Sequence, residues 1–125
     1  MILDTDVLIW YLRGNTKARD IVERNIPFSI SIVTYAELIQ GMKSKKELQL
    51  LSRNFSGWGI DIIHIDKDIS SRAMFYMQEY ALSHSLTFPD ALIAATAVQK
   101  NDVLITANYK HYRFIPNLVC KRFLP

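Results

Sequence analysis

The sequence contains a single cysteine, Cys120, so no internal disulfide can form and nothing points to an oxidising compartment. No uninterrupted apolar run approaches the roughly 18 residues that a membrane-spanning helix needs. The first six residues, MILDTD, carry acids where a secretory signal would have basic residues and a long apolar stretch. We therefore expect a cytoplasmic protein with no membrane association.

Glycine and proline are also scarce, with four of each in 125 residues. They are scattered along the chain, and no linker, repeat or low-complexity tract interrupts it. Half of the residues are hydrophobic and 22% are charged, as in an ordinary globular domain. We predict a single domain over residues 1–125, which is long enough to bury a hydrophobic core.

Several motifs of catalysis and ligand binding are absent as well. We find no phosphate-binding P-loop, no glycine-rich dinucleotide motif and no serine nucleophile elbow. The three histidines, His64, His84 and His111, are isolated in the sequence, and no His/Cys set has zinc spacing. The net charge of +3 is compatible with a polyanionic partner, although by itself it is weak support for one.

Strand-like and helix-like segments alternate along the chain, which predicts an α/β fold with a mostly parallel sheet. Strands are expected at residues 1–4, 28–32, 60–65 and 103–106, with a last edge strand at 119–123. Helices are expected over residues 7–12, 15–25, 45–55, 66–83 and 90–100, with a further helix beginning at Thr34. Residues 56–59 are predicted to form a loop.

The first candidate functional residues are Asp4 and Asp6, directly after the apolar residues Met1 to Leu3. In a parallel α/β sheet, ligands bind at the carboxyl ends of the strands, where Asp4 would lie. A charge next to a buried strand is costly without a partner or a metal, which favours a functional role for Asp4. Asp6 is as well explained as a helix cap.

Two further acids lie near predicted helix starts. Thr34 and Glu37 match the capping-box pattern, in which the glutamate accepts a hydrogen bond from the backbone amide three residues earlier. Asp90 follows Pro89 at the start of an almost wholly apolar helix. The helix dipole favours an acid there, but the carboxylate must face either solvent or a polar pocket.

Each acid therefore has a local explanation, and the joint pattern is what indicates a site. If the three junctions meet at one edge of the sheet, their carboxylates raise each other's pKa unless a cation neutralises them. Carboxylate oxygens are hard ligands that suit Mg²⁺ or Mn²⁺. Such an ion supports phosphodiester cleavage by water without a covalent nucleophile.

Four segments resemble, in order, the successive motifs of the PIN domain: MILDTDVLI at 1–9, SIVTYAELIQG at 31–41, DALIAATA at 90–97 and LITAN at 104–108. The resemblance spans essentially the whole chain and extends to the VapC-type toxins of prokaryotic toxin–antitoxin pairs. It implies a three-layer α/β/α fold around a mostly parallel sheet of four to five strands. It also implies Mg²⁺- or Mn²⁺-dependent endoribonuclease activity, a homodimer, and inhibition by a small antitoxin that wraps the toxin near its site.

The resemblance assigns roles residue by residue, and it leaves one departure. Many members of the family carry an acid where this chain has His111, which leaves the number of bound metals open. His111 is a candidate to contact phosphate or to bind a metal weakly, and it is equally well explained as a surface residue. The family's principal acids match Asp4, Glu37 and Asp90; an auxiliary acid matches Asp6; the polar positions after the fourth strand match Thr106 and Asn108.

Basic residues near these motifs are candidate contacts for RNA, although each group is also explained as a solvated face. One group follows the predicted helix that carries Glu37, and the other flanks His111. The candidates are Lys43, Lys45, Lys46, Lys110 and Arg113.

Three alternatives compete with this interpretation. A haloacid dehalogenase-type phosphatase would use Asp4 as a covalent nucleophile and Asp6 as a general acid, but its lysine and late acid pair are not found. A receiver domain would need an acid at the end of its third strand and a later lysine, and Asp66 is a poor match. A PIN-like binding module without activity is supported only by His111.

Overall fold

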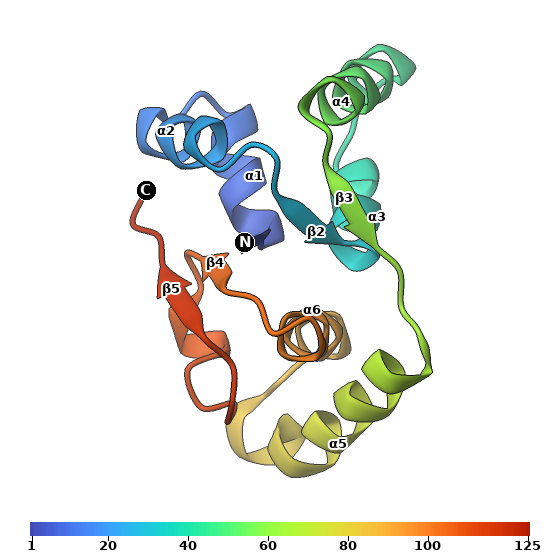
Figure 1. Cartoon of the computed structure of the whole chain (residues 1–125), viewed down its shortest axis with the longest axis vertical. Helices are drawn as coiled ribbons and strands as arrows, with labels where there is room; N and C mark the ends of the chain where they lie inside the picture. The colour runs from blue at the N-terminus through green and yellow to red at the C-terminus, as the bar shows by residue number, and fades with distance from the viewer.

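The computed structural model describes residues 1–125 and is built around a five-stranded sheet in which every strand is parallel to its neighbours (Figure 1). The strand order is β3-β2-β1-β4-β5. The predicted edge strand is therefore confirmed, and so is the α/β class. The strands are β1 (Ile2–Leu3), β2 (Ser29–Ser31), β3 (Asp61–Ile63), β4 (Leu104–Thr106) and β5 (Cys120–Arg122).

Six α-helices and one short 3-10 helix connect these strands, and no helix is both long enough and apolar enough to cross a membrane. Two of the predicted caps are confirmed, because Asn15 Oδ1 accepts from the Ala18 amide and Asp66 Oδ1 from the Ile69 amide. The helices are α1 (Thr5–Leu12), α2 (Thr16–Arg24), α3 (Ile32–Gln40), α4 (Lys45–Trp58), α5 (Lys67–His84), α6 (Phe88–Gln99) and η1 (Tyr109–His111).

The loop predicted at residues 56–59 is wrong, because α4 continues through Gly57 to Trp58. The Trp58 ring packs against the rings of Tyr11 and Phe28, with centroids 5.5 and 6.3 Å apart. This packing outweighs the low helix propensity of Gly57. The helix ends one residue later at Gly59, whose left-handed backbone (φ 67°) is a conformation that glycine adopts without strain.

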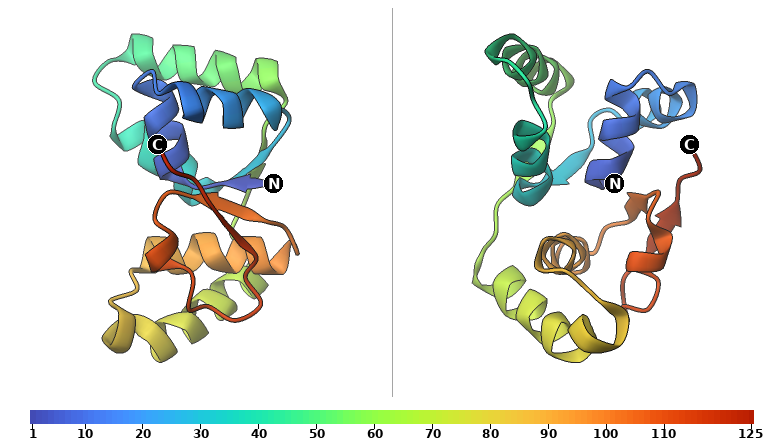
Figure 2. Two further views of the ribbon diagram at one scale, coloured as in Figure 1. Left: turned by 90° about the vertical axis from the view of Figure 1, so that its left-hand side faces the viewer. Right: turned by 180° about the vertical axis from the view of Figure 1, so that it is seen from behind.

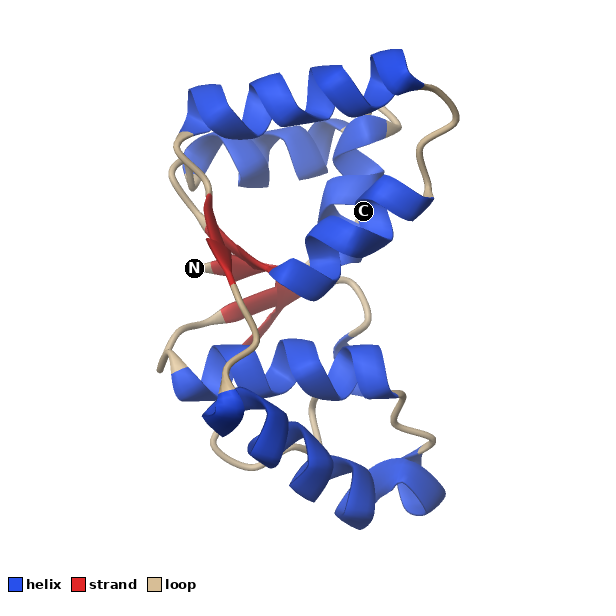
Figure 3. Cartoon of the chain, turned by 90° about the vertical axis from the view of Figure 1, so that its right-hand side faces the viewer, coloured by secondary structure: helices blue, strands red, loops and turns tan.

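The helices cover both faces of the sheet and form the three layers that the family resemblance implied (Figures 2 and 3). Successive side chains of a strand point to opposite faces. Ile2 and Leu104 accordingly lie in a core with α5 and α6, whereas Leu3 and Ile105 lie in a second core with α1, α2 and α4. The two central strands are therefore buried on both sides.

The connections place a switch point between β1 and β4. From β1 the chain passes through α1 and α2 to β2, and from β2 through α3 and α4 to β3. Helices α5 and α6 then carry it back to β4, on the other side of β1. In open parallel sheets, ligands bind at the carboxyl ends of the strands where the order reverses. The polar residues that follow β1 and end β4 lie at this place.

Candidate active site

Asp4 lies at the carboxyl end of β1 and joins it to β4. Its side chain is only 4% exposed. One carboxylate oxygen, Oδ1, accepts a hydrogen bond from the Thr5 amide (2.8 Å), so Asp4 caps α1. The other, Oδ2, accepts from the Thr106 hydroxyl at the end of β4 (2.8 Å). Asp4, and not Asp6, is therefore the cap of this helix.

Asp6 lies in the first turn of α1 and also points to the end of β4. Its Oδ2 accepts from the Ala107 amide (3.0 Å) and from the Thr106 hydroxyl (3.3 Å). Thr106 thus stands between two carboxylates, and the Asn108 amide donates to the same hydroxyl oxygen (3.0 Å). The second oxygen of Asp6, Oδ1, is buried and has no hydrogen-bond partner.

Asp90 lies in the first turn of α6. This helix ends at Gln99, shortly before the amino end of β4, so its first turn lies towards the opposite, carboxyl edge of the sheet. Thr87 caps this helix, with the Asp90 amide 3.4 Å from its hydroxyl. The Asp90 carboxylate is held by the segment after β4. The Tyr112 hydroxyl donates to Oδ1 (3.1 Å), and His111 Nδ1 lies 3.3 Å from Oδ2.

The capping box predicted for Thr34 and Glu37 is wrong. Helix α3 begins at Ile32, because Ser31 caps it by accepting from the Val33 amide (3.1 Å). Glu37 therefore lies in the second turn of α3, and its side chain does not reach back to its own helix start. Its Oε1 accepts instead from the Thr5 hydroxyl (2.7 Å).

Thr5 is a site residue that sequence reasoning missed. Its hydroxyl bonds to Glu37 and also to the Thr34 hydroxyl (3.0 Å), so it links α3 to the turn that carries Asp4. In the sequence, only its position between Asp4 and Asp6 could have indicated this role. Tyr112 was missed too, although it directly follows His111. The structure thus brings all four predicted acids to the carboxyl edge of β1 and β4.

The electrostatic environment of the site acts on the two acids at the end of β1 and the start of α1. Burial, the charge of Asp6 and, more weakly, that of Asp90 raise the pKa of Asp4 from 3.8 to about 7, against the opposing hydrogen bonds from Thr106 and Thr5. Burial also raises the pKa of Asp6, although the Ala107 amide partly offsets it. Burial and these negative charges raise the pKa of the half-buried Cys120 thiol to about 11, which makes it a poor nucleophile at neutral pH.

The carboxylates fit a hard divalent cation without forming a closed cage. No three His, Cys, Asp or Glu side chains converge tightly enough to hold a metal ion on their own. Mg²⁺ is usually bound through one or two carboxylates and keeps several waters. The adjacent Asp4 and Asp6, with one buried oxygen of Asp6 unpartnered, supply that donor set. The predicted magnesium or manganese site is therefore chemically consistent with these residues.

The predicted RNA contacts are all exposed and are not paired with the acids. Lys43 is exposed just before α4, Lys45 and Lys46 are exposed in its first turn, and Lys110 and Arg113 are exposed beside His111. No salt bridge joins any of these five to the acids. Asn108 is exposed and takes part through its backbone amide.

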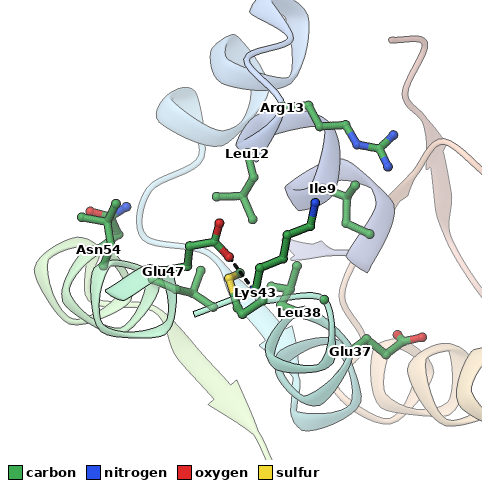
Figure 4. Close-up of a pocket in the computed structure, with 12 residues that line it drawn as sticks. Ile9, Leu12, Arg13, Glu37, Leu38, Lys43, Glu47 and Asn54 are labelled. Carbon is green, nitrogen blue, oxygen red and sulfur yellow. Dashed lines mark hydrogen bonds between the residues drawn. The ribbon is translucent and has the colours of Figure 1, made fainter. Parts of the chain in front are cut away.

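A groove of about 530 Å³ lies between α1, α3 and α4, with Glu37 at its rim (Figure 4). Charged side chains line its edges, among them Arg13, Lys43 and Glu47; the Lys43 amide donates to the Glu47 carboxylate (2.6 Å). The groove therefore offers an apolar floor close to the acidic site. Its apolar lining is Ile9, Leu12, Leu38, Met42, Leu50 and Leu51.

The model of the PIN domain matches residues 1–115 of this chain. The chain belongs to the PIN-domain family. Among curated proteins, this PIN domain is similar to Ribonuclease VapC10 of Mycobacterium tuberculosis, with 35% identity over 94% of this chain and 90% of the relative. It is also similar to Ribonuclease VapC1 of Methanocaldococcus jannaschii, with 34% identity over 90% of this chain and 78% of the relative. The predicted resemblance to VapC-type proteins is thereby confirmed.

Solved structures share the same fold. A toxin–antitoxin complex from Klebsiella pneumoniae superposes with a TM-score of 0.75 at 33% identity, over 94% of each chain. VapBC2 from Rickettsia felis, bound to a DNA fragment from its promoter, gives a TM-score of 0.80 at 23% identity over 98% of each chain. The family assignment removes the haloacid dehalogenase and receiver alternatives.

The Thr5 link to Glu37 can be tested with Thr5→Val, which keeps the side-chain shape and removes the hydroxyl. The variant frees the Glu37 carboxylate and leaves the buried Thr34 hydroxyl without a partner. We expect a loss of about 1–3 kcal/mol in the free energy of unfolding, measured by urea titration. We also expect at least a severalfold fall in the cleavage activity proposed below. Thr5→Ser restores the hydroxyl and should recover both; equal defects in both variants would contradict the link.

Proposed function

We propose that this PIN domain is an endoribonuclease that requires Mg²⁺ or Mn²⁺ and acts as the toxin of a toxin–antitoxin pair. The observation that carries the proposal is the convergence of acids from β1, α1, α3 and α6 at the switch point of a parallel sheet, with Asp4 buried and one Asp6 oxygen unpartnered. The names of the similar curated proteins, which are ribonucleases, support the same reaction.

In this proposal Asp4, Asp6 and Asp90 would bind the cation together with several waters, since the three side chains alone form no closed metal site. Glu37 lies on the other side of the Thr5 hydroxyl. When bound, the cation acts as a Lewis acid that lowers the pKa of a water and neutralises charge on the phosphate. Thr106 orients the Asp4 and Asp6 carboxylates through its hydroxyl. Glu37, fixed by Thr5, is placed to accept a proton from the attacking water.

Substrate binding is proposed to rely on the exposed basic residues around the site. A single-stranded RNA is bound largely through its phosphates, and its affinity then falls steeply with salt. Replacement of one phosphate-contacting lysine should weaken RNA binding and reduce that salt dependence. The candidates remain Lys43, Lys45 and Lys46 on one side and Lys110, Arg113 and the half-exposed His111 on the other.

The proposed partner is a small antitoxin protein, and the groove between α1, α3 and α4 is its proposed binding surface. Similar structures are described as VapBC or toxin–antitoxin complexes. The apolar floor suits the apolar face of a short helix, and the charged edges suit polar groups beside it. A partner held there would cover Glu37 and block the site.

The homodimer and the cytoplasmic location stay predictions. Light scattering of the purified protein would test the homodimer.

The first experiment incubates purified protein, free of any bound partner, with a fluorescently labelled single-stranded RNA. Reactions contain Mg²⁺, Mn²⁺ or EDTA, and the panel includes Asp4→Asn, Asp90→Asn and the control Asp68→Asn, an exposed acid on α5. We expect cleavage that needs the metal and both site acids and is unchanged in the control. Absence of cleavage on a panel of unstructured and structured RNAs, together with no thermal stabilisation by either metal, would instead support a binding module.

A further inference from the structure

Both oxygens of the Asp90 carboxylate are contacted by residues that follow β4. Tyr112 donates its hydroxyl proton to Oδ1 (3.1 Å), and His111 Nδ1 approaches Oδ2 (3.3 Å). The two contacts differ in their surroundings. The His111 side chain is 59% exposed, whereas Tyr112 is 1% exposed and belongs to the core formed with α5 and α6. Tyr112 is therefore the fixed contact of the pair.

The Tyr112 hydroxyl can act only as a donor to its acidic neighbours. An ionised carboxylate offers only acceptor oxygens, so the phenol is the donor in the bond to Asp90 Oδ1 (3.1 Å). A neutral hydroxyl in this position gives Asp90 a charge-assisted hydrogen bond, which is stronger than a bond between neutral groups. The bond fixes how far the carboxylate can rotate at the start of α6.

We propose that Tyr112 is a positioning residue, whose hydroxyl holds Asp90 in the orientation that lets it join Asp4 and Asp6 around a divalent cation. The inference rests on the proposed function. Outer groups that hydrogen-bond to a metal ligand set its orientation, and their loss costs about 10–100-fold in metal affinity or activity. No sequence motif marked Tyr112 for this role.

A second buried tyrosine supplies the matched control. Tyr76 on α5 is 2% exposed and lies in the same hydrophobic core as Tyr112. Its hydroxyl has no hydrogen-bond partner. Tyr76→Phe and Tyr112→Phe therefore remove the same atom from the same core, and only the second removal breaks a contact with the site.

The test is a Mn²⁺ titration of the full chain and of both phenylalanine variants, read as the rise in melting temperature and by calorimetry. We expect Tyr112→Phe to weaken Mn²⁺ binding by about tenfold or more and Tyr76→Phe to change it less than twofold. RNA cleavage by Tyr112→Phe should recover towards the wild-type rate at high Mn²⁺. A purely structural role for the hydroxyl predicts a lower melting temperature without a change in metal affinity.

The outcomes separate this inference from the proposed function. Wild-type protein that binds Mn²⁺ and cleaves RNA, with equal Mn²⁺ affinity in Tyr112→Phe, would overturn the role of Tyr112 and leave the nuclease intact. Wild-type protein that binds no Mn²⁺ and cleaves no RNA would overturn both. Selective loss of affinity in Tyr112→Phe supports both.

Discussion

Asp4→Asn is expected to abolish RNA cleavage and at the same time to stabilise the metal-free protein. The Asp4 carboxylate is buried beside the charge of Asp6, which raises its pKa to about 7. Above that pH the folded protein must hold an unfavourable negative charge, and the amide removes it. The same substitution removes a principal ligand of the proposed cation, for which we expect a fall in activity of about 100-fold or more.

The local hydrogen bonds can accommodate the amide. The Asn oxygen can accept from the Thr5 amide, as Asp4 Oδ1 does at 2.8 Å. The amide nitrogen then faces the Thr106 hydroxyl, which can accept from it and turn its own proton to Asp6, whose Oδ2 lies 3.3 Å away. We therefore expect no unsatisfied buried group to offset the gain.

Thermal unfolding in EDTA at pH 8 tests the stability half of this prediction. The melting temperature of Asp4→Asn should exceed that of wild-type protein by about 5 °C or more. The order should reverse, or the gap should close, when millimolar Mg²⁺ stabilises only the wild-type protein. An Asp68→Asn control, which removes a first-turn acid from α5, should lower the melting temperature only slightly and should respond to Mg²⁺ as wild type does. Lower stability of Asp4→Asn in EDTA would show that the carboxylate is not destabilising and would contradict the electrostatic account of the site.

The metal-free protein is also expected to lose stability as the pH rises from about 4 to about 7. The pKa of Asp4 is raised in the folded state, so between these values the folded protein binds more protons than the unfolded chain. The stabilising contribution of the protonated carboxyl is complete below the unfolded pKa of 3.8 and is lost as the pH passes through the folded pKa of about 7. Asp6 contributes with the same sign.

The expected loss from Asp4 is on the order of 4 kcal/mol, because each unit of pKa difference corresponds to about 1.4 kcal/mol. Urea unfolding in EDTA at several pH values measures it. Comparison with Asp4→Asn isolates this group from the other titrating residues, and the variant should show a much flatter profile. Parallel profiles for the two proteins would mean that Asp4 has an ordinary pKa in the folded state.

Much of the fold could be predicted because its signals are local. The polar caps Asn15 and Asp66 stand directly before apolar periodic segments, and both act as caps in the structure. The acids Asp4 and Asp90 were found in the same way, since each follows a junction that a short window of sequence reveals. Because the strands on both sides of β1 are parallel to it, these junctions lie at the same edge of the sheet.

The contacts within the site could not be predicted in that way, because they join residues far apart in the sequence. Thr106 bonds to Asp4 across the sheet, and Thr5 bonds to Glu37 across two helices. Neither pairing leaves a local pattern. The capping box misled the prediction for Glu37, because Ser31 was an equally good cap three residues earlier and its position at the end of β2 decided the helix start.

Thr106 has one hydroxyl proton and two carboxylates that compete for it, at 2.8 Å to Asp4 and 3.3 Å to Asp6. This is local frustration in the sense of folding landscapes, because one donor cannot satisfy both acceptors although the surrounding native state is well packed. Mutational drift would relieve it readily, since loss of Asp4 is expected to increase the stability of the metal-free protein. We therefore expect a lineage released from selection on catalysis to lose this acid early.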